Sequence, residues 1–263
     1  MKIILGINYK FFELSPKDLF NLIETYDKDF VIEGFEVGLG QITDIGVNLD
    51  YITKLASLCK EKNYIFNIHS PIFGKIKNSH TYLDFLNVIT NNTNIVMHLL
   101  NNTEEHLIVA NGYLDSMLKY IENKNYNIQI SLENLNIMNG KVRTTKEDIM
   151  FFLEKYPNLK FTYDWGHEII DGVDIKELPK ILADRLNNVH IHSYKNNQDH
   201  YPIEDMKKLK ELINILNNIN YKDTIVLEYS VDYIEGNTLE EKFINYINHA
   251  KEINKVLGEN KND

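Results

Sequence analysis

The stretch "FTYDWGHEII", residues 161–170, joins a strand pattern to a carboxylate and an imidazole. Phe161 and Tyr163, flanked by β-favouring neighbours, predict a strand. The polar end of this strand includes Asp164, which lies three residues before His167. Strands that end in side chains capable of chemistry recur along the rest of the chain.

Short apolar runs rich in β-branched residues alternate with longer segments of helical spacing. The runs that predict strands are residues 2–8, 34–39, 64–69, 94–99, 128–134, 160–165, 188–194 and 224–230. Amphipathic patterns predict helices at residues 16–26, 49–63, 104–124, 145–156, 206–219 and 239–257. This alternation predicts an α/β fold, a (β/α)8 TIM barrel, with an open doubly wound sheet as the alternative.

The domain organisation follows from length and composition. A chain of 263 residues that is 43% hydrophobic and 25% charged fits one ordered domain with a sizeable core. No Pro-rich or Gly-rich linker divides it. We therefore expect a single barrel domain over residues 1–257 and a frayed C-terminal tail over residues 258–263.

The charge and the cysteine content restrict location and partners. A net charge of -10 disfavours nucleic acid, whose phosphates attract basic proteins. No apolar run approaches the roughly 18 residues of a membrane span. The single Cys59 cannot form an internal disulfide, and Met1 leads directly into the first strand pattern. We expect a cytoplasmic protein; whether it forms a homodimer is left open.

Side chains able to bind metals or transfer protons cluster at the carboxyl ends of the third to eighth predicted strands. In a barrel these ends form the rim on which active sites are built. The residues are His69, His98, Glu133, Asp164, His190, His192 and Glu228. They are expected to meet in one pocket, and His190 and His192, two residues apart, share one face of their strand.

Four of the residues have the character of a divalent-metal site. The set is Glu133, Asp164, His190 and Glu228. Carboxylates with one imidazole suit Mn²⁺, Mg²⁺ or Co²⁺, and further imidazoles shift the preference toward Zn²⁺ or Fe²⁺. The histidines that could provide that addition are His69, His98, His167 and His200.

Further side chains are candidates for substrate contacts. A tight turn through Gly166 can bring His167 back over Asp164, where it would bind a second ion or a substrate hydroxyl. Trp165 could form an apolar wall for a sugar ring. The candidates for substrate binding at this rim are His192, Trp165 and Glu36.

Six short motifs together resemble one family. They are "IHSP" at 68–71, "VMHL" at 96–99, "LEN" at 132–134, "YDWGH" at 163–167, "VHIHSYKNNQDHYP" at 189–202 and "LEY" at 227–229. In this order, over nearly the whole chain, they resemble the xylose isomerase-like TIM-barrel superfamily. That group includes sugar and sugar-phosphate isomerases and epimerases, inosose dehydratases, and the endonuclease IV family of abasic-site nucleases.

The resemblance to the sugar epimerases implies one metal ion and two proton-transferring carboxylates. The metal ligands would be Glu133, Asp164, His190 and Glu228. Glu133 and Glu228 would also transfer the proton on opposite faces of the sugar, and His167 would contact the substrate. The arginine that these epimerases often carry after the seventh strand is absent, since Asn196 and Asn197 stand there.

The resemblance to endonuclease IV implies up to three zinc ions. His69 and His98 would complete one site, and His167 and His200 would belong to another. That branch has a carboxylate two residues before its last histidine, where this chain has Gln198, although Asp199 could compensate.

The function expected from the sequence is a metal-dependent isomerase or epimerase of a small sugar or sugar phosphate. The ion would polarise a carbonyl and a hydroxyl while the two glutamates move a proton at the neighbouring carbon. The first alternative is a multinuclear zinc phosphoesterase, either an abasic-site endonuclease or a hydrolase of a small phosphodiester. The second is a non-catalytic sugar-binding barrel, which the presence of the ligands disfavours.

Overall fold

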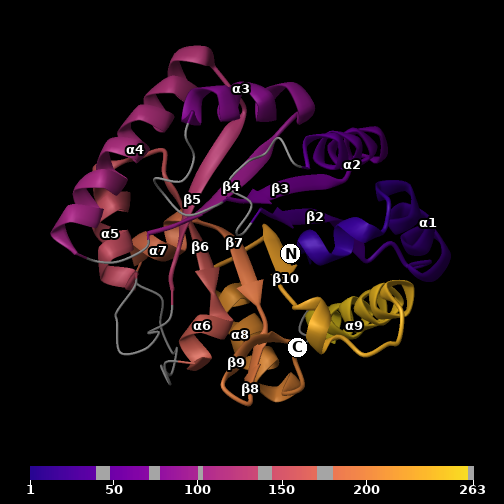
Figure 1. Cartoon of the computed structure of the whole chain (residues 1–263). Coiled ribbons are helices and arrows are strands. Elements are labelled where there is room, and N and C mark those ends of the chain that lie inside the picture. The colour runs from indigo at the N-terminus through magenta and orange to yellow at the C-terminus, as the bar shows by residue number, and fades with distance from the viewer. Residues whose placement is uncertain (40–47, 71–77, 100–102, 136–143, 171–179, 260–263) are drawn as a thin grey trace.

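The computed structural model describes residues 1–39, 48–70, 78–99, 103–135, 144–170 and 180–259. Parallel strands close into a barrel in the order β1-β10-β7-β6-β5-β4-β3-β2 (Figure 1). The barrel strands are β1 (Lys2–Ile7), β2 (Ile32–Gly38), β3 (Ile65–His69), β4 (Thr93–His98), β5 (Ile128–Glu133), β6 (Lys160–Asp164), β7 (Leu186–Ile191) and β10 (Thr224–Leu227). The closed eight-stranded barrel confirms the predicted (β/α)8 fold.

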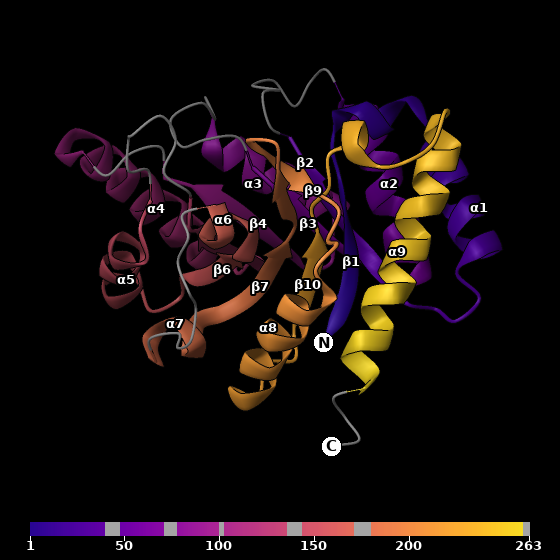
Figure 2. The same ribbon diagram turned by 90° about the horizontal axis from the view of Figure 1, so that it is seen from below.

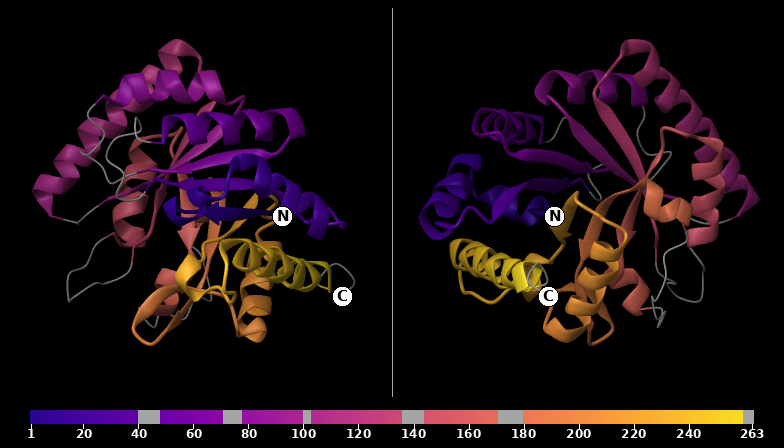
Figure 3. Two further views of the ribbon diagram at one scale, coloured as in Figure 1. Left: turned by 45° about the vertical axis from the view of Figure 1, so that its right-hand side comes forward. Right: turned by 180° about the vertical axis from the view of Figure 1, so that it is seen from behind.

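Helices surround the barrel on the outside (Figures 1 and 2). They are α1 (Pro16–Tyr26), α2 (Leu49–Lys62), α3 (Ser79–Ile89), α4 (Glu104–Lys124), α5 (Lys146–Lys155), α6 (Trp165–Ile170), α7 (Lys180–Arg185), α8 (Met206–Asn218) and α9 (Leu239–Glu259). Short 3-10 turns lie at η1 (Tyr9–Glu13) and η3 (Val231–Tyr233). Since α9 packs against α1, the last helix adjoins the first, as the rotated views also show (Figure 3).

Local sequence signals explain where the helices begin. The Ser15 hydroxyl accepts a hydrogen bond from the Asp18 N–H before α1. Thr145 and Asp148 form a reciprocal capping box at the start of α5. These contacts use backbone groups that the first helical turn leaves without partners.

The strands divide their side chains between two environments. Leu132 and Phe161 face outward into the apolar core between strands and helices. Their neighbours Ser131 and Thr162 face the barrel interior, where their hydroxyls are 2.6 Å apart. The interior is therefore polar, and at its carboxyl end it is charged.

The sequence predicted one strand over residues 188–194, but the structure has two strands there. β7 ends at Ile191, and β8 (Ser193–Lys195) pairs antiparallel with β9 (Gln198–Tyr201). Asn196 and Asn197 have φ of 54° and 61° and form the two-residue turn of this hairpin. Such turns require positive φ and favour Asn, so the Asn-Asn pair was a hairpin signal.

Other predicted boundaries also need correction. Trp165 begins α6 instead of ending a strand, and the last barrel strand ends at Leu227, three residues earlier than predicted. Helices α3, α6 and α7 were not among the helices predicted from the sequence. Gly258 and Glu259 belong to α9, and the rest of the predicted tail, residues 260–263, lies outside the described residues. Within the described part of the chain, no helix has the length and hydrophobicity of a membrane span.

Candidate metal centre

The carboxyl ends of the strands bring the predicted ligands together. Glu133 and Asp164 are the last residues of β5 and β6, His190 lies on β7, and Glu228 directly follows β10. The side chains of Glu133, Asp164 and His190 are fully buried. Parallel strands in register place all four at one end of the barrel, as predicted.

One compact group surrounds the Nδ1 atom of His190. This atom lies 3.4 Å from Glu133 Oε1 and 3.0 Å from Glu228 Oε2. His69 Nε2 lies 3.0 Å from Glu133 Oε2 and 3.8 Å from Glu228 Oε1. His69, Glu133, His190 and Glu228 can each offer one ligand atom within 4.8 Å of the others. We call these four residues the glutamate cluster.

Three buried atoms of the glutamate cluster have no hydrogen-bond partner outside the cluster among the described residues. They are Glu133 Oε1, His190 Nδ1 and Glu228 Oε2. Buried polar atoms are rarely left without partners, and closely spaced buried carboxylates repel each other unless a cation neutralises them. A divalent ion bound to these atoms would remove both penalties, so the residues fit the metal that the sequence predicts.

Asp164 lies beside the glutamate cluster but is not one of its four compact members. Its Oδ1 accepts a 2.7 Å hydrogen bond from the backbone N–H of His167, and Oδ2 lies 3.8 Å from His190 Nδ1. Asp164 also groups with Glu133 and His167 on one side, and with His192 and Glu228 on the other. It can therefore contribute to an ion in the glutamate cluster or to one beside it.

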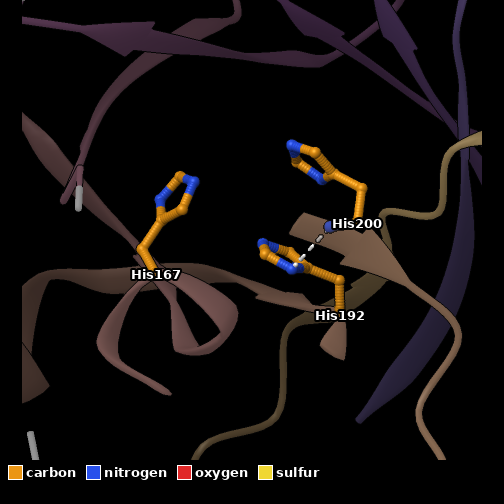
Figure 4. A group of neighbouring side chains, drawn as sticks. All are labelled: His167, His192 and His200. Carbon is orange, nitrogen blue, oxygen red and sulfur yellow. Dashed lines mark hydrogen bonds between the residues drawn. The ribbon is translucent and has the colours of Figure 1, made fainter. Parts of the chain in front are cut away.

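A second group consists of three imidazoles that face a common space (Figure 4). We call His167, His192 and His200 the histidine cluster. His167 Nδ1 donates to the Asn134 carbonyl at 2.8 Å, and His200 Nδ1 donates to the Glu228 carbonyl at 3.0 Å. Both rings thus direct the lone pair of Nε2 away from the backbone, which is the usual arrangement of metal-binding histidines.

Gly166 allows His192 to reach the histidine cluster. A Cβ atom at residue 166 would lie 2.1 Å from His192 Cε1, far inside van der Waals contact. The sequence predicted a tight turn at Gly166, but the residue lies inside α6. Its lack of a side chain instead lets the His192 ring pack closely against the helix. The spacing of Asp164 and His167 instead reflects the hydrogen bond that Asp164 makes to the first turn of α6.

Comparison with known proteins agrees with this architecture. Residues 102–251, more than half of the chain, match the family described as xylose isomerase-like TIM barrel. The chain belongs to this family. No curated protein sequence matches it.

Several solved structures share the fold of this xylose isomerase-like barrel. A D-tagatose 3-epimerase-like protein has a TM-score of 0.66 at 17% identity, with 99% of each chain covered. D-psicose 3-epimerase from Clostridium cellulolyticum H10, solved with D-tagatose, has a TM-score of 0.66 at 14% identity, covering 98% of this chain and 99% of its own. The IolI protein, solved with zinc, has a TM-score of 0.68 at 16% identity over 98% and 99% of the chains.

The charges of the two clusters shift the pKa values of their members. Burial alone would lower the pKa of His190, but Glu36, Glu133 and Glu228 raise it well above its ordinary value. Burial also lowers the pKa of His69, but the hydrogen bond and the charge of Glu133 outweigh it and raise that pKa to about 9. Before a metal binds, these imidazoles therefore hold protons that the ion must displace.

The pKa values of the two glutamates shift in the opposite direction. Burial raises them, but nearby imidazoles outweigh it, led by His98 for Glu133 and by His190 for Glu228. Both pKa values fall well below the ordinary value. The carboxylates are consequently ionised at neutral pH and can act as ligands or proton acceptors.

His98 has a supporting position in this barrel. Its Nε2 lies 2.7 Å from Glu133 Oε2, the same oxygen that His69 contacts. His98 is in none of the compact ligand groups found among the described residues. Burial lowers its pKa, so it is more readily neutral than His69.

The predicted substrate contacts are mostly buried. Trp165 is 7% exposed and packs in the apolar core, and His192 lies 3.2 Å from Asp164 Oδ1 with no exposed surface. Glu36 is 2% exposed and its Oε1 lies 2.8 Å from His190 Nε2. A cavity of about 220 Å³ opens beside His69 and His200, so a small molecule can approach both clusters.

A larger cavity, about 570 Å³, lies at the opposite end of the barrel. It is lined by residues at the amino ends of strands, including Lys2 and Thr224, and it contains none of the predicted ligands. Because barrel active sites lie at the carboxyl ends, the smaller cavity is the functional candidate.

Gln198 does not face the histidine cluster. Its side-chain carbonyl accepts a hydrogen bond from the Tyr233 hydroxyl. Asp199 Oδ2 lies 3.8 Å from His200 Nε2 but belongs to none of the compact ligand groups in the described part of the chain. His192, predicted from the sequence as a substrate contact, is the third member of the histidine cluster.

Asn134 is an important residue that was not predicted from the sequence, although it ends the "LEN" motif. Its side-chain oxygen accepts the backbone N–H of Asp164 at 2.8 Å, and its amide donates to the Asp164 carbonyl at 2.9 Å. Its own carbonyl orients His167. One amide residue therefore positions two members of the site.

Proposed function

We propose that this protein is a divalent-metal-dependent epimerase or isomerase of a small sugar or sugar phosphate. The observation that carries the proposal is the convergence of Glu133 Oε1, His190 Nδ1 and Glu228 Oε2 without other partners. His69 or Asp164 would complete the ligand set. When bound, the ion would act as a Lewis acid toward the substrate carbonyl and hydroxyl oxygens.

The two glutamates have the properties that proton transfer requires. Both are ionised at neutral pH because their pKa values are lowered. One carboxylate would accept the proton from the carbon next to the carbonyl. The other would first take up a proton from solvent in the cavity, which Glu228 lines, and would then deliver it to the opposite face. His167, with its Nδ1 fixed by the Asn134 carbonyl, would hold a substrate hydroxyl.

Structural relatives support this reaction class. They include a D-tagatose 3-epimerase-like protein and D-psicose 3-epimerase, and the IolI structure holds a zinc atom. The cavity of about 220 Å³ suits a small substrate. The native ion, Zn²⁺ or Mn²⁺ with Mg²⁺, Co²⁺ and Fe²⁺ as further candidates, belongs to the same proposal, as does a cytoplasmic location.

The test is substrate-dependent proton exchange. Metal-loaded protein is incubated in D2O with ketopentoses, ketohexoses and their phosphates, and deuterium incorporation is followed by NMR. Glu133→Gln should lower the exchange rate at least about 100-fold, because it removes a proton acceptor. Glu154 is an exposed residue of α5, and Glu154→Gln is the matched control, which should leave the exchange rate unchanged. Full exchange by Glu133→Gln would refute the assigned role.

A second candidate is a multinuclear zinc phosphoesterase, and the histidine cluster favours it. His192 groups with His167 and His200, whereas Gln198 bonds the Tyr233 hydroxyl. The candidate predicts more than one zinc ion per chain, with one ion lost in His200→Asn and hydrolysis of a small phosphodiester. A single ion, unaffected by His200→Asn, would exclude it.

A further inference from the structure

Glu36 connects the two sides of the barrel interior. It lies on β2, whereas its partner His190 lies on β7, and β1 and β10 separate these strands in the barrel. The Glu36 side chain therefore crosses the interior below the glutamate cluster. It is 2% exposed, and Asn188 and His190 beside it have no exposed surface.

Both carboxylate oxygens of Glu36 are engaged. Oε1 lies 2.8 Å from His190 Nε2, and Oε2 accepts a 2.8 Å hydrogen bond from Asn188 Nδ2. The Thr224 hydroxyl donates to Asn188 Oδ1 at 2.6 Å. This last bond fixes the orientation of the amide, so that its NH₂ group faces the carboxylate.

These contacts determine which nitrogen of His190 carries hydrogen. A carboxylate can only accept, so Nε2 must donate to Glu36. The opposite tautomer would direct the Nε2 lone pair at a carboxylate oxygen 2.8 Å away, which is repulsive. Asn188 Nδ2 lies 3.1 Å from the same Nε2. Both nitrogens are donors, and each donates to a different oxygen of the Glu36 carboxylate. When the proton on Nδ1 leaves to make room for an ion, the lone pair of the neutral His190 ring is therefore on Nδ1, beside Glu133 and Glu228.

We propose that Glu36 is a positioning residue that holds His190 in its metal-binding tautomer and orientation. The proposal gives Glu36 a different role from the substrate contact expected from the sequence. Glu36 lines the small cavity, but its two oxygens contact His190 and Asn188. It rests on the proposed function only in requiring that His190 binds a divalent ion. Removing such a partner of a metal-binding histidine typically weakens metal affinity 10-fold to 100-fold.

The first experiment measures zinc and manganese affinity by chelator competition. Glu36→Gln should weaken binding about 10-fold to 100-fold, because glutamine has only one oxygen and its NH₂ group then faces the NH₂ group of Asn188. The double variant Glu36→Gln with Asn188→Asp restores a donor-acceptor pair at that contact and should recover most of the affinity. Unchanged affinity in Glu36→Gln would overturn the proposal.

Glu36→Asp separates contact from charge. It keeps the negative charge but withdraws the carboxylate from Nε2, and it should weaken metal binding as Glu36→Gln does. This variant also keeps the test decisive if Glu36→Gln does not fold. Wild-type affinity in Glu36→Asp would show that the contact is not required.

Two readouts distinguish positioning from a purely structural role. ¹⁵N-histidine NMR of the zinc-loaded wild type should show hydrogen on Nε2 of His190; hydrogen on Nδ1 would refute the proposal. Relative to the wild type, each Glu36 variant should lose less melting temperature without metal than with metal. A structural role instead predicts the same loss of melting temperature in both states and an unchanged metal affinity. None of these measurements requires sugar turnover, so failure of the proposed reaction would leave them interpretable.

Discussion

Glycine at residue 166 is required by the imidazole that packs against it. Gly166→Ala would place a methyl group 2.1 Å from His192 Cε1. Either the His192 ring or α6 must move, and overpacking of this kind costs about 1–3 kcal/mol. We expect thermal denaturation of the metal-free protein to shift down by roughly 2–10 °C.

Gly112 in α4 is the matched control for that substitution. A Cβ atom there meets nothing within 4 Å, and the residue is helical. Gly112→Ala should stabilise the protein slightly, by about 0.5–1 kcal/mol. Similar melting temperatures for the two variants would contradict the packing role of Gly166.

At the scale of single elements, the β8–β9 hairpin determines where His200 lies. The Tyr201 ring stacks on Tyr233 with centroids 3.8 Å apart, and the Tyr233 hydroxyl bonds Gln198. Tyr233→Ala removes both contacts, and an aromatic pair contributes about 0.5–1.5 kcal/mol. We expect zinc binding at the histidine cluster to weaken roughly threefold to tenfold in a calorimetric titration.

Tyr194→Ala is the control for the hairpin prediction. Tyr194 lies on β8 and is 38% exposed. Its hydroxyl donates to Asn197 Oδ1 in the same hairpin at 3.3 Å. Its removal should leave zinc binding unchanged. Equal effects of the two tyrosines would mean that the stacking does not position His200.

The sequence predicted the barrel strands well because their apolar runs are short and bounded by polar ends. It failed at β7, where "VHIHSY" continues the β pattern across the break that begins the hairpin. It also missed α3, although Tyr82, Leu83, Leu86 and Ile89 have helical spacing. Periodicity identifies elements, but it does not show where one β-favouring run becomes two strands.

Strand ends likewise predicted that Glu133, Asp164, His190 and Glu228 lie at the same end of the barrel, where the structure has them. The sequence did not show that His69, not Asp164, completes the compact group. It also did not show that Glu36 faces His190. Both depend on distances across the interior between strands that are not neighbours, and the period-2 pattern carries no information about those distances.

For the molecule as a whole, metal removal should reduce stability. Zinc at about 100 times its dissociation constant would stabilise the folded state by about 2.7 kcal/mol. That corresponds to roughly 5–10 °C in melting temperature for a chain of this size. Differential scanning calorimetry before and after chelation measures it, and a melting temperature unaffected by chelator would contradict a bound ion.

The stability of the metal-free protein should depend on pH in a defined direction. His69 and His192 have pKa values raised to about 9 from 6.5. The protonated rings stabilise the folded state through their contacts with carboxylates. This contribution to the free energy of unfolding is complete below pH 6.5 and is lost as pH rises through about 9. The melting temperature should fall over that interval. Since zinc must displace these protons, the zinc-induced increase should be larger at pH 9 than at pH 6.5.

The polar contacts across the barrel interior also bear on how the chain folds. Glu36 and Asn188 are 152 positions apart in the sequence, and His69 and Glu133 are 64 apart. A strand that slipped by one residue would turn these groups outward and replace them with apolar neighbours. The buried hydrogen bonds therefore penalise closure of the cylinder with any strand shifted by one residue, and in this way they favour the native register.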